Sequence, residues 1–219
     1  MTQCLTFMCY PTEKVKLQGK MFCFPEEHST SYVKLTPLVS QSLSSATVCL
    51  RFYTDQVEGQ LTAFFSMNTA TQPAALTILR HMPSRSYPQQ YELHVGNKAV
   101  FFNGLDYTLN RWNSLCATWN GVNGMSQMMI NDKLSVRKLT YAGLSIGPKP
   151  SIILGQNQDG YADAFVGHIK DVHMWDYVLA SSQVANYMQD GFVAFTPGNY
   201  LNWNKMEYTI NGTVLVEDI

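Results

Sequence analysis

The sequence predicts an all-β fold in which two antiparallel sheets pack as a sandwich, with one short α-helix near residues 181–190. Three observations support this prediction. Strand-length runs rich in β-branched and aromatic residues recur along the chain, two pairs of runs are joined by two-residue turns, and one segment has helical periodicity. Short strands at this spacing are typical of a sandwich, and 219 residues are enough for one large domain of this class.

The strands are predicted from side-chain patterns. Residues 47–54 combine β-branched and aromatic side chains, and residues 91–95 alternate apolar and polar side chains with period two. Gly96-Asn97 and Asn131-Asp132 each separate two such runs by a two-residue turn of hairpin type, which predicts antiparallel neighbours. The runs that follow these turns are residues 99–102 and 134–136. Further strand-like runs are residues 22–24, 31–33, 63–65, 115–119, 128–130, 151–154, 169–174 and 208–210.

The helix is predicted from its cap and its apolar face. Ser181 is a plausible N-cap, Val184, Tyr187 and Met188 share one face, and Gly191 can adopt the left-handed conformation that ends a helix. Residues 1–19 have little strand pattern, so we interpret them as an N-terminal extension of a single domain at residues 20–219.

Charge and hydropathy exclude several classes of partner. Lys and Arg number 15 against 16 Asp and Glu, so the chain lacks the basic surplus that nucleic-acid binding requires, and we expect no nucleic-acid partner. No apolar run approaches the roughly 18 residues of a transmembrane segment, so none is expected. The apolar run between Cys4 and Tyr10 is too short for a secretory signal, and no such signal is legible.

Cysteine and histidine spacing argues against zinc. The five cysteines include no C-x-x-C pair, so one or two disulfides could form with a thiol left over. His168 and His173 are five residues apart on a predicted strand, which directs them to opposite faces unless the strand bulges. We therefore expect no zinc site.

Motifs of hydrolytic enzymes are incomplete. Residues 143–147 match the G-x-S-x-G nucleophile elbow, but Pro148 and Pro150 exclude the helix that must follow its serine. No two acidic residues occupy one face of a predicted strand, as the carboxylate pair of a glycosidase would require. A non-enzymatic role is therefore predicted, and a carbohydrate-active enzyme on the same architecture is the alternative of another class.

One loop offers oxygen donors at the end of a predicted strand. Asn157, Gln158 and Asp159 follow residues 151–154, and Asp163 is close in the sequence. Calcium takes about 6–8 oxygen ligands, so two acids and two amides are too few by themselves. From the residues alone, the loop could be an ordinary polar turn or part of a cation site.

Five segments, residues 24–33, 47–54, 116–119, 151–159 and 174–179, resemble the short pentraxins, the family of C-reactive protein and serum amyloid P component. They occur in the family's order and with similar spacing. The resemblance implies a flattened, lectin-like jelly roll of concanavalin type, with a disulfide between Cys49 and Cys116. It also places Cys23 in the first strand, where we expect a small buried apolar side chain.

The resemblance further implies a secreted, extracellular protein. It also implies an acute-phase protein of innate immunity that self-associates as a cyclic homo-oligomer. The subunit number need not be five. The sequon at Asn211 is compatible with glycosylation, although Asn-Gly is equally a turn signal. Microbial or damaged-cell surfaces are the expected ligands, and complement is a further possible partner.

The same resemblance locates two binding sites and shows how this chain departs from them. Family members hold two calcium ions through an Asp-Asn pair in one loop and a Glu-Gln-Asp run in a second. Pro73 and Ala74 stand at the pair, whereas the second loop keeps Gln158 and Asp159 but has Asn157 for its Glu. Because the second loop is shorter than the family's, Asp163 is the remaining candidate for its distal ligands.

The phosphocholine pocket departs as well. Leu79, His94 and Ala99 stand at the aromatic wall, the small hydroxyl residue and the choline-facing Glu of the family. We predict a multivalent pattern-recognition protein with a degraded calcium and phosphocholine site, and calcium binding that is weak or absent. The alternative is a conventional calcium-dependent phosphocholine binder, in which Asp163 and backbone carbonyls complete the coordination.

Overall fold

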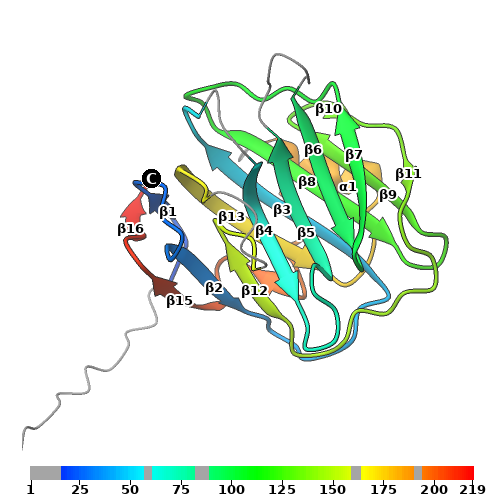
Figure 1. Ribbon diagram of the computed structural model, residues 1–219. Helices are drawn as coiled ribbons and strands as arrows, with labels where there is room; N and C mark the ends of the chain where they lie inside the picture. The colour runs from blue at the N-terminus through cyan, green and yellow to red at the C-terminus, as the bar shows by residue number, and fades with distance from the viewer. Residues whose placement is uncertain (1–15, 57–60, 82–88, 159–163, 190–193) are drawn as a thin grey trace, which may run out of the picture.

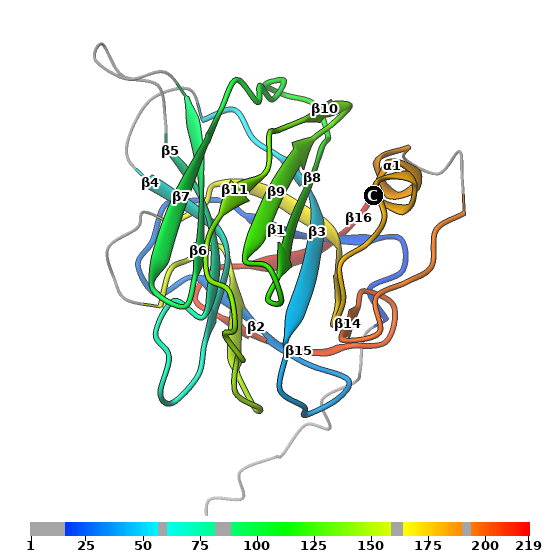
Figure 2. The same ribbon diagram turned by 90° about the vertical axis from the view of Figure 1, so that its right-hand side faces the viewer.

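The computed structural model describes residues 16–56, 61–81, 89–158, 164–189 and 194–219. Its strands form two antiparallel sheets that pack face to face, which confirms the predicted sandwich (Figures 1 and 2). The nine-stranded sheet contains β1 (Lys20–Phe24), β3 (Ser45–Tyr53), β8 (Asn113–Asn120), β9 (Met125–Ile130), β10 (Lys133–Leu134), β11 (Lys138–Leu139), β13 (Gly167–Trp175), β14 (Leu201–Asn202) and β16 (Leu215–Asp218). The seven-stranded sheet contains β2 (Tyr32–Thr36), β4 (Leu61–Asn68), β5 (Leu76–His81), β6 (Gln90–Val95), β7 (Lys98–Asn103), β12 (Ser151–Leu154) and β15 (Glu207–Asn211).

Strand order brings distant segments together. The nine-stranded sheet runs β10-β9-β8-β3-β13-β1-β16, with β11 paired to β9 and β14 to β13. The seven-stranded sheet runs β15-β2-β12-β4-β5-β6-β7. The first and last strands of the chain, β1 and β16, therefore lie side by side at one edge of the larger sheet (Figure 1).

The core fills the space between the two inner faces with aromatic side chains. Phe22 and Trp203 meet edge to face with ring centroids 5.2 Å apart, an arrangement that aromatic rings favour. Leu17, which precedes β1, is 1% exposed, and its carbonyl accepts a hydrogen bond of 2.8 Å from Trp203 Nε1. The last residues of the predicted extension thus pack into the domain.

Both predicted hairpins are confirmed. Gly96 and Asn97, between β6 and β7, have φ values of 55° and 67°, as a two-residue turn of type I′ requires. Asn131, between β9 and β10, has a φ of 52°. The strand predicted at residues 134–136 is wrong beyond Leu134, because the Ser135 hydroxyl accepts the backbone N–H of Met128 in place of a ladder carbonyl.

Helix α1 (Ser181–Met188) lies on the outer face of the nine-stranded sheet (Figure 2). Its buried residues are Val184 and Tyr187, two of the three predicted for its apolar face. The predicted N-cap is wrong by one residue: Ala180 is the cap, and its backbone N–H donates to Gln183 Oε1 at 2.9 Å. Because this side chain reaches back to the cap, no cap hydroxyl is needed. The predicted terminator Gly191 lies outside the described residues.

A β-bulge in β13 changes which way its histidines face. Asp171 and Val172 together oppose Leu50 of β3, so the pairing register shifts by one residue. Because side chains alternate along a strand, the extra residue returns His168 and His173 to the same outer face. The prediction that they lie on opposite faces is therefore wrong, and the sequence pattern gave no sign of the bulge.

Candidate functional site

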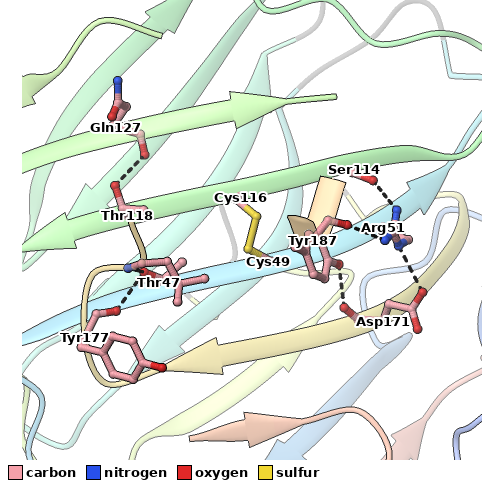
Figure 3. Close-up of a disulfide and its surroundings, with 11 residues drawn as sticks. Thr47, Cys49, Arg51, Ser114, Cys116, Thr118, Gln127, Asp171, Tyr177 and Tyr187 are labelled. Atoms are coloured by element: carbon pink, nitrogen blue, oxygen red, sulfur yellow. Dashed lines mark hydrogen bonds and ion pairs between the residues drawn. A yellow bond between two sulfur atoms is a disulfide. The ribbon is translucent and has the colours of Figure 1, made fainter. Parts of the chain in front are cut away.

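The disulfide implied by the family resemblance is present. Cys49 of β3 and Cys116 of β8 occupy directly opposing positions on neighbouring strands and are bonded to each other (Figure 3). They pack in a small apolar cluster beneath α1, with Trp175 and Tyr187. The bond therefore supports the outer face of the nine-stranded sheet, away from the candidate calcium loops.

The first candidate calcium loop connects β4 to β5. Pro73 is exposed and Ala74 adopts a left-handed backbone conformation with φ of 50°. The backbone N–H of Ala74 donates to the side-chain oxygen of Asn68 at 2.9 Å, which closes the loop. Neither Pro73 nor Ala74 has a side-chain oxygen that could bind calcium. The side-chain oxygen of Asn68, at the base of the loop, accepts the N–H of Ala74.

The second candidate loop follows β12 and turns its amides toward Ser66 of β4. The Ser66 hydroxyl donates to Asn157 Oδ1 at 3.2 Å. Gln158 Nε2 donates to the carbonyls of Ser66 and Ser151, at 3.0 Å and 2.9 Å. Asn157 is only 9% exposed, so its oxygen faces the protein. The other two predicted ligands, Asp159 and Asp163, lie outside the described residues.

The structure brings these two loops to the same part of the sheet. Ser151, which accepts from Gln158, pairs across the strands with Asn68, which holds Ala74. Calcium requires about 6–8 oxygens, preferably with several carboxylates. The described members of this set, at positions 73, 74, 157 and 158, include no carboxylate, and two have no side-chain donor. The described positions therefore supply at most two of the side-chain oxygens that a calcium site needs.

The three residues at the phosphocholine positions do come together. Leu79, His94 and Ala99 lie on β5, β6 and β7, which are adjacent strands, and His94 directly opposes Ala99. They face away from the core, because alternate residues such as Leu93 pack into it. Leu79 is only 2% exposed, so it offers little accessible apolar surface.

An unpredicted cluster of two histidines and one glutamate occupies this outer face. Glu92 of β6 accepts hydrogen bonds from His94 Nε2 at 2.7 Å and from His81 Nε2 at 2.5 Å. Burial alone would raise the pKa of the Glu92 carboxyl, but the hydrogen bonds and charges of the two histidines together hold this pKa below its usual value. The exposed ring of Phe101 lies 5.5 Å from that of His81. We call His81, Glu92 and His94 the His-Glu-His cluster.

Comparison with known proteins identifies the family. The model of the Pentaxin family matches residues 20–218. The chain belongs to the pentraxins. Jeltraxin of Lepidobatrachus laevis is 32% identical over 220 residues, which cover 97% of this chain and 92% of jeltraxin. C-reactive protein of Sus scrofa is 36% identical over 205 residues, which cover 91% of this chain and 87% of that protein.

A solved structure shows the same architecture. The native heptameric SAP-like pentraxin from Limulus polyphemus superposes with a TM-score of 0.80, at 19% identity, over 93% of this chain and 97% of that chain. At this identity the likeness shows the fold alone, and it confirms the lectin-like jelly roll. The family-model match and the C-reactive protein relative make the chain a pattern-recognition protein of the pentraxin type.

The opposite face of this pentraxin carries a groove. It has a volume of about 360 Å³ and lies between α1 and the strands β8 and β9. Its lining includes Thr118, Gln127, Met129 and Val184. Since α1 and the His-Glu-His cluster are on different sheets, the two surfaces face away from each other (Figure 2).

Part of the His-Glu-His cluster was legible in the sequence. Glu92 and His94 are two residues apart in a predicted alternating strand, so their shared face follows from the period alone. His81 could not be added without the pairing of β5 with β6, because β5 had not been predicted as a strand.

Proposed function

We propose that this pentraxin is a secreted, non-enzymatic, multivalent pattern-recognition protein whose calcium and phosphocholine site has degraded. The observation that carries the proposal is the composition of the two loops beside β4. Asn157 and Gln158 hydrogen-bond to Ser66, and Pro73 and Ala74 have no side-chain donors. A chain with this donor set should bind calcium weakly or not at all.

Secretion is supported by the disulfide. The Cys49–Cys116 bond is of a kind that persists in oxidising compartments, and a relative at 33% identity is named serum amyloid P-component. No helix among the described residues is long and apolar enough to cross a membrane. Asn211 ends β15, and Gly212 has a φ of 71°, so the sequon lies at a turn. Mass spectrometry of the secreted protein tests for a glycan on Asn211.

Multivalency would compensate for weak individual sites. The Limulus relative is a heptamer, and we propose a cyclic homo-oligomer here, with a subunit number that light scattering can measure. Several sites on one ring raise the effective concentration at a repetitive surface, so overall avidity can exceed that of one site by about 10²–10⁴. Microbial or damaged-cell surfaces fit this mode of binding, and complement recruitment is a secondary proposal.

The test is calorimetry of calcium binding followed by phosphocholine binding with and without chelator. We expect no micromolar calcium isotherm and no chelator-sensitive retention on phosphocholine. A matched variant restores donors through Pro73→Asp, Ala74→Asn and Asn157→Glu, and Asn tolerates the left-handed backbone of Ala74. The restored variant should bind calcium more tightly than the natural chain.

Two results would favour the alternatives. A micromolar isotherm with calcium-dependent phosphocholine binding in the natural chain would establish the conventional binder, with Asp159 and Asp163 as ligands. Turnover of a polysaccharide would establish the carbohydrate-active enzyme. Either result would refute the proposal.

A further inference from the structure

Three strands bring a cysteine, a histidine and a glutamate together on the outer face of the nine-stranded sheet. Cys23 of β1 directly opposes His168 of β13, and Glu217 comes from β16 on the other side of β1. One ligand atom from each side chain lies within 4.8 Å of the other two. All three residues are partly exposed, so an ion could reach them from solvent.

The prediction that the Cys23 side chain is buried is therefore wrong. Cys23 was predicted to be a small buried apolar side chain, but it is partly exposed and outside the disulfide. Its neighbours Phe22 and Phe24 point into the core, so the alternation of β1 directs Cys23 outward. The thiol is thus presented beside a ring nitrogen and a carboxylate.

The separations are close to those of a tetrahedral zinc site. Zinc binds sulfur at about 2.3 Å, and nitrogen and oxygen at about 2.0–2.2 Å, which places tetrahedral ligand atoms roughly 3.5 Å apart. His168 Nε2 and Glu217 Oε2 are already 3.9 Å apart. Cys23 and Glu217 are partly exposed, so rotation of their side chains can shorten the remaining separations.

The donor types select zinc over the hard cations. A thiolate and an imidazole suit zinc, whereas calcium and magnesium prefer oxygen throughout. A thiolate and a carboxylate together carry two negative charges, which balance the charge of a divalent ion. Three protein ligands leave the fourth tetrahedral position for water or another small donor.

Aromatic rings fix the position of the histidine. The ring of His168 lies 5.6 Å from that of Tyr53 and 6.4 Å from that of Trp112. The Lys170 ammonium lies 4.3 Å from the centre of the Trp112 ring, a cation–π contact on the same face. These contacts limit the rotation of the imidazole, and a preorganised ligand loses less entropy when the ion binds.

We propose that Cys23, His168 and Glu217 form a zinc-binding site, distinct from the calcium loops and from the His-Glu-His cluster. Without metal, burial and then the charge of Glu217 raise the pKa of the Cys23 thiol, so zinc displaces a proton when it binds. The sequence argued against zinc because it has no Cys/His ligand spacing. Here the ligands come from three strands that are distant along the chain.

Cobalt substitution tests the site on the full chain. A Cys4→Ser, Cys9→Ser background leaves Cys23 as the one thiol outside the disulfide. We expect one cobalt ion per chain, tetrahedral visible bands and a thiolate-to-cobalt charge-transfer band, all displaced by zinc. Cys23→Ser should abolish the charge-transfer band. His168→Gln and Glu217→Gln should each weaken zinc binding by at least about 10- to 100-fold, the loss caused even by removing an outer partner.

Controls separate this site from other metal-binding groups. His28→Gln alters an exposed histidine elsewhere, and His81→Gln disrupts the His-Glu-His cluster, so both should leave the cobalt spectrum unchanged. Far-UV circular dichroism checks that each variant is folded. The proposal is refuted if cobalt gives no thiolate band, or if zinc affinity is the same in the folded Cys23→Ser variant as in its parent.

Discussion

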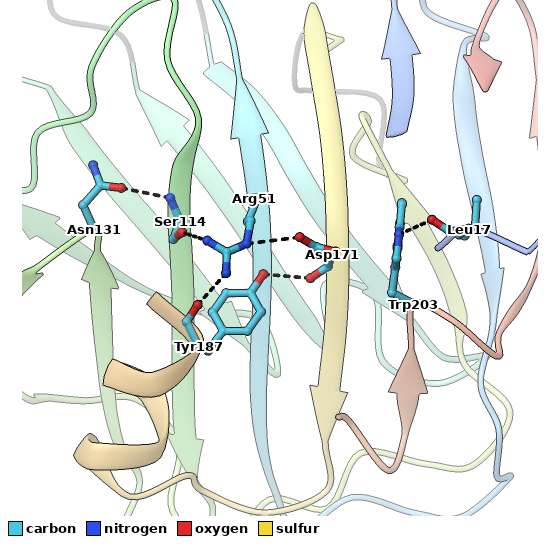
Figure 4. Close-up of polar contacts among 7 residues, drawn as sticks. All are labelled: Leu17, Arg51, Ser114, Asn131, Asp171, Tyr187 and Trp203. Carbon is cyan, nitrogen blue, oxygen red and sulfur yellow. Dashed lines mark hydrogen bonds and ion pairs between the residues drawn. The ribbon is translucent and has the colours of Figure 1, made fainter. Parts of the chain in front are cut away.

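Arg51 of β3 donates a hydrogen bond of 2.6 Å to the carbonyl of Tyr187, in the last turn of α1, and its guanidinium lies 4.8 Å from the centre of the Tyr187 ring. The same guanidinium donates to Ser114 Oγ at 2.6 Å and pairs with Asp171 at 3.2 Å (Figure 4). Tyr187 in turn donates its hydroxyl to the Asp171 carbonyl at 2.7 Å. One buried cation thus ties the helix to β3, β8 and β13.

Replacing this cation should loosen the helix. Helix α1 has no basic residue in its last turn, so Arg51 supplies the positive charge that favours a helix C-terminus. Arg51→Met leaves the Tyr187 carbonyl and the Asp171 carboxylate without this donor and should destabilise the protein by about 2–4 kcal/mol. Urea unfolding measures the loss, and hydrogen exchange should show faster exchange in residues 181–188. Arg111→Met, at an exposed loop position, should change stability by less than about 0.5 kcal/mol.

Acid should destabilise the fold through His173. Burial, and then the charge of Arg51, lower the pKa of His173 to about 4, from a usual 6.5. Between pH 6.5 and pH 4, His173 is therefore protonated in the unfolded chain but neutral in the folded chain. The free energy of unfolding should fall over this range as the pH drops, by at most about 3 kcal/mol. Below pH 4 both states are protonated and this contribution stops changing.

A single substitution should remove most of this slope. The Nδ1 atom of His173 accepts the backbone N–H of Gly198 at 3.2 Å, and the amide oxygen of His173→Asn can take over that role. Unfolding free energy measured from pH 7 to pH 5 should then be nearly flat compared with the natural chain. His28→Gln, at an exposed position, is the control, and an unchanged slope in His173→Asn would contradict the assignment.

Loss of the disulfide should be costly because it closes a long loop. Cys49 and Cys116 are 67 positions apart, so the bond encloses 68 residues (116 − 49 + 1), for which chain entropy gives about 4 kcal/mol. Urea unfolding of the Cys49→Ala, Cys116→Ala variant should give a free energy of unfolding that is lower by about this amount. Reduction of the natural chain should have a similar effect, and a difference below about 1 kcal/mol would contradict the prediction.

Local patterns predicted the strands whose side chains alternate or cluster, and missed those where a tertiary contact overrides the pattern. Residues 91–95 and the Gly96-Asn97 turn predicted β6 and β7, because period and turn chemistry agree there. Strand β5 was missed. It contains Arg80, a charged residue that is fully buried beneath the ring of Tyr107, at 4.6 Å, and this breaks the alternation expected of a strand.

The site was harder to predict than the fold, since its residues meet only through register. The resemblance assigned Leu79, His94 and Ala99 to the phosphocholine pocket, and the pairing of β5, β6 and β7 shows that they lie on adjacent strands. Cys23 and His168 meet because β1 and β13 pair, a relationship between the beginning of the domain and its last long strand. A single sequence contains no signal for such pairing, nor for the bulge in β13.

The His-Glu-His cluster should contribute stability that disappears in acid. Because the pKa of Glu92 is lowered in the folded state, its contribution is present above the usual pKa of about 4.5 and is lost as the pH falls through the folded value. Glu92→Gln leaves His81 and His94 with a neutral acceptor and should cost about 1–3 kcal/mol at pH 7, with a smaller loss below pH 4. Glu27→Gln, at an exposed position, should leave stability unchanged at both pH values. An equal loss for Glu92→Gln at pH 7 and at pH 3 would show that packing, and not charge, holds the cluster together.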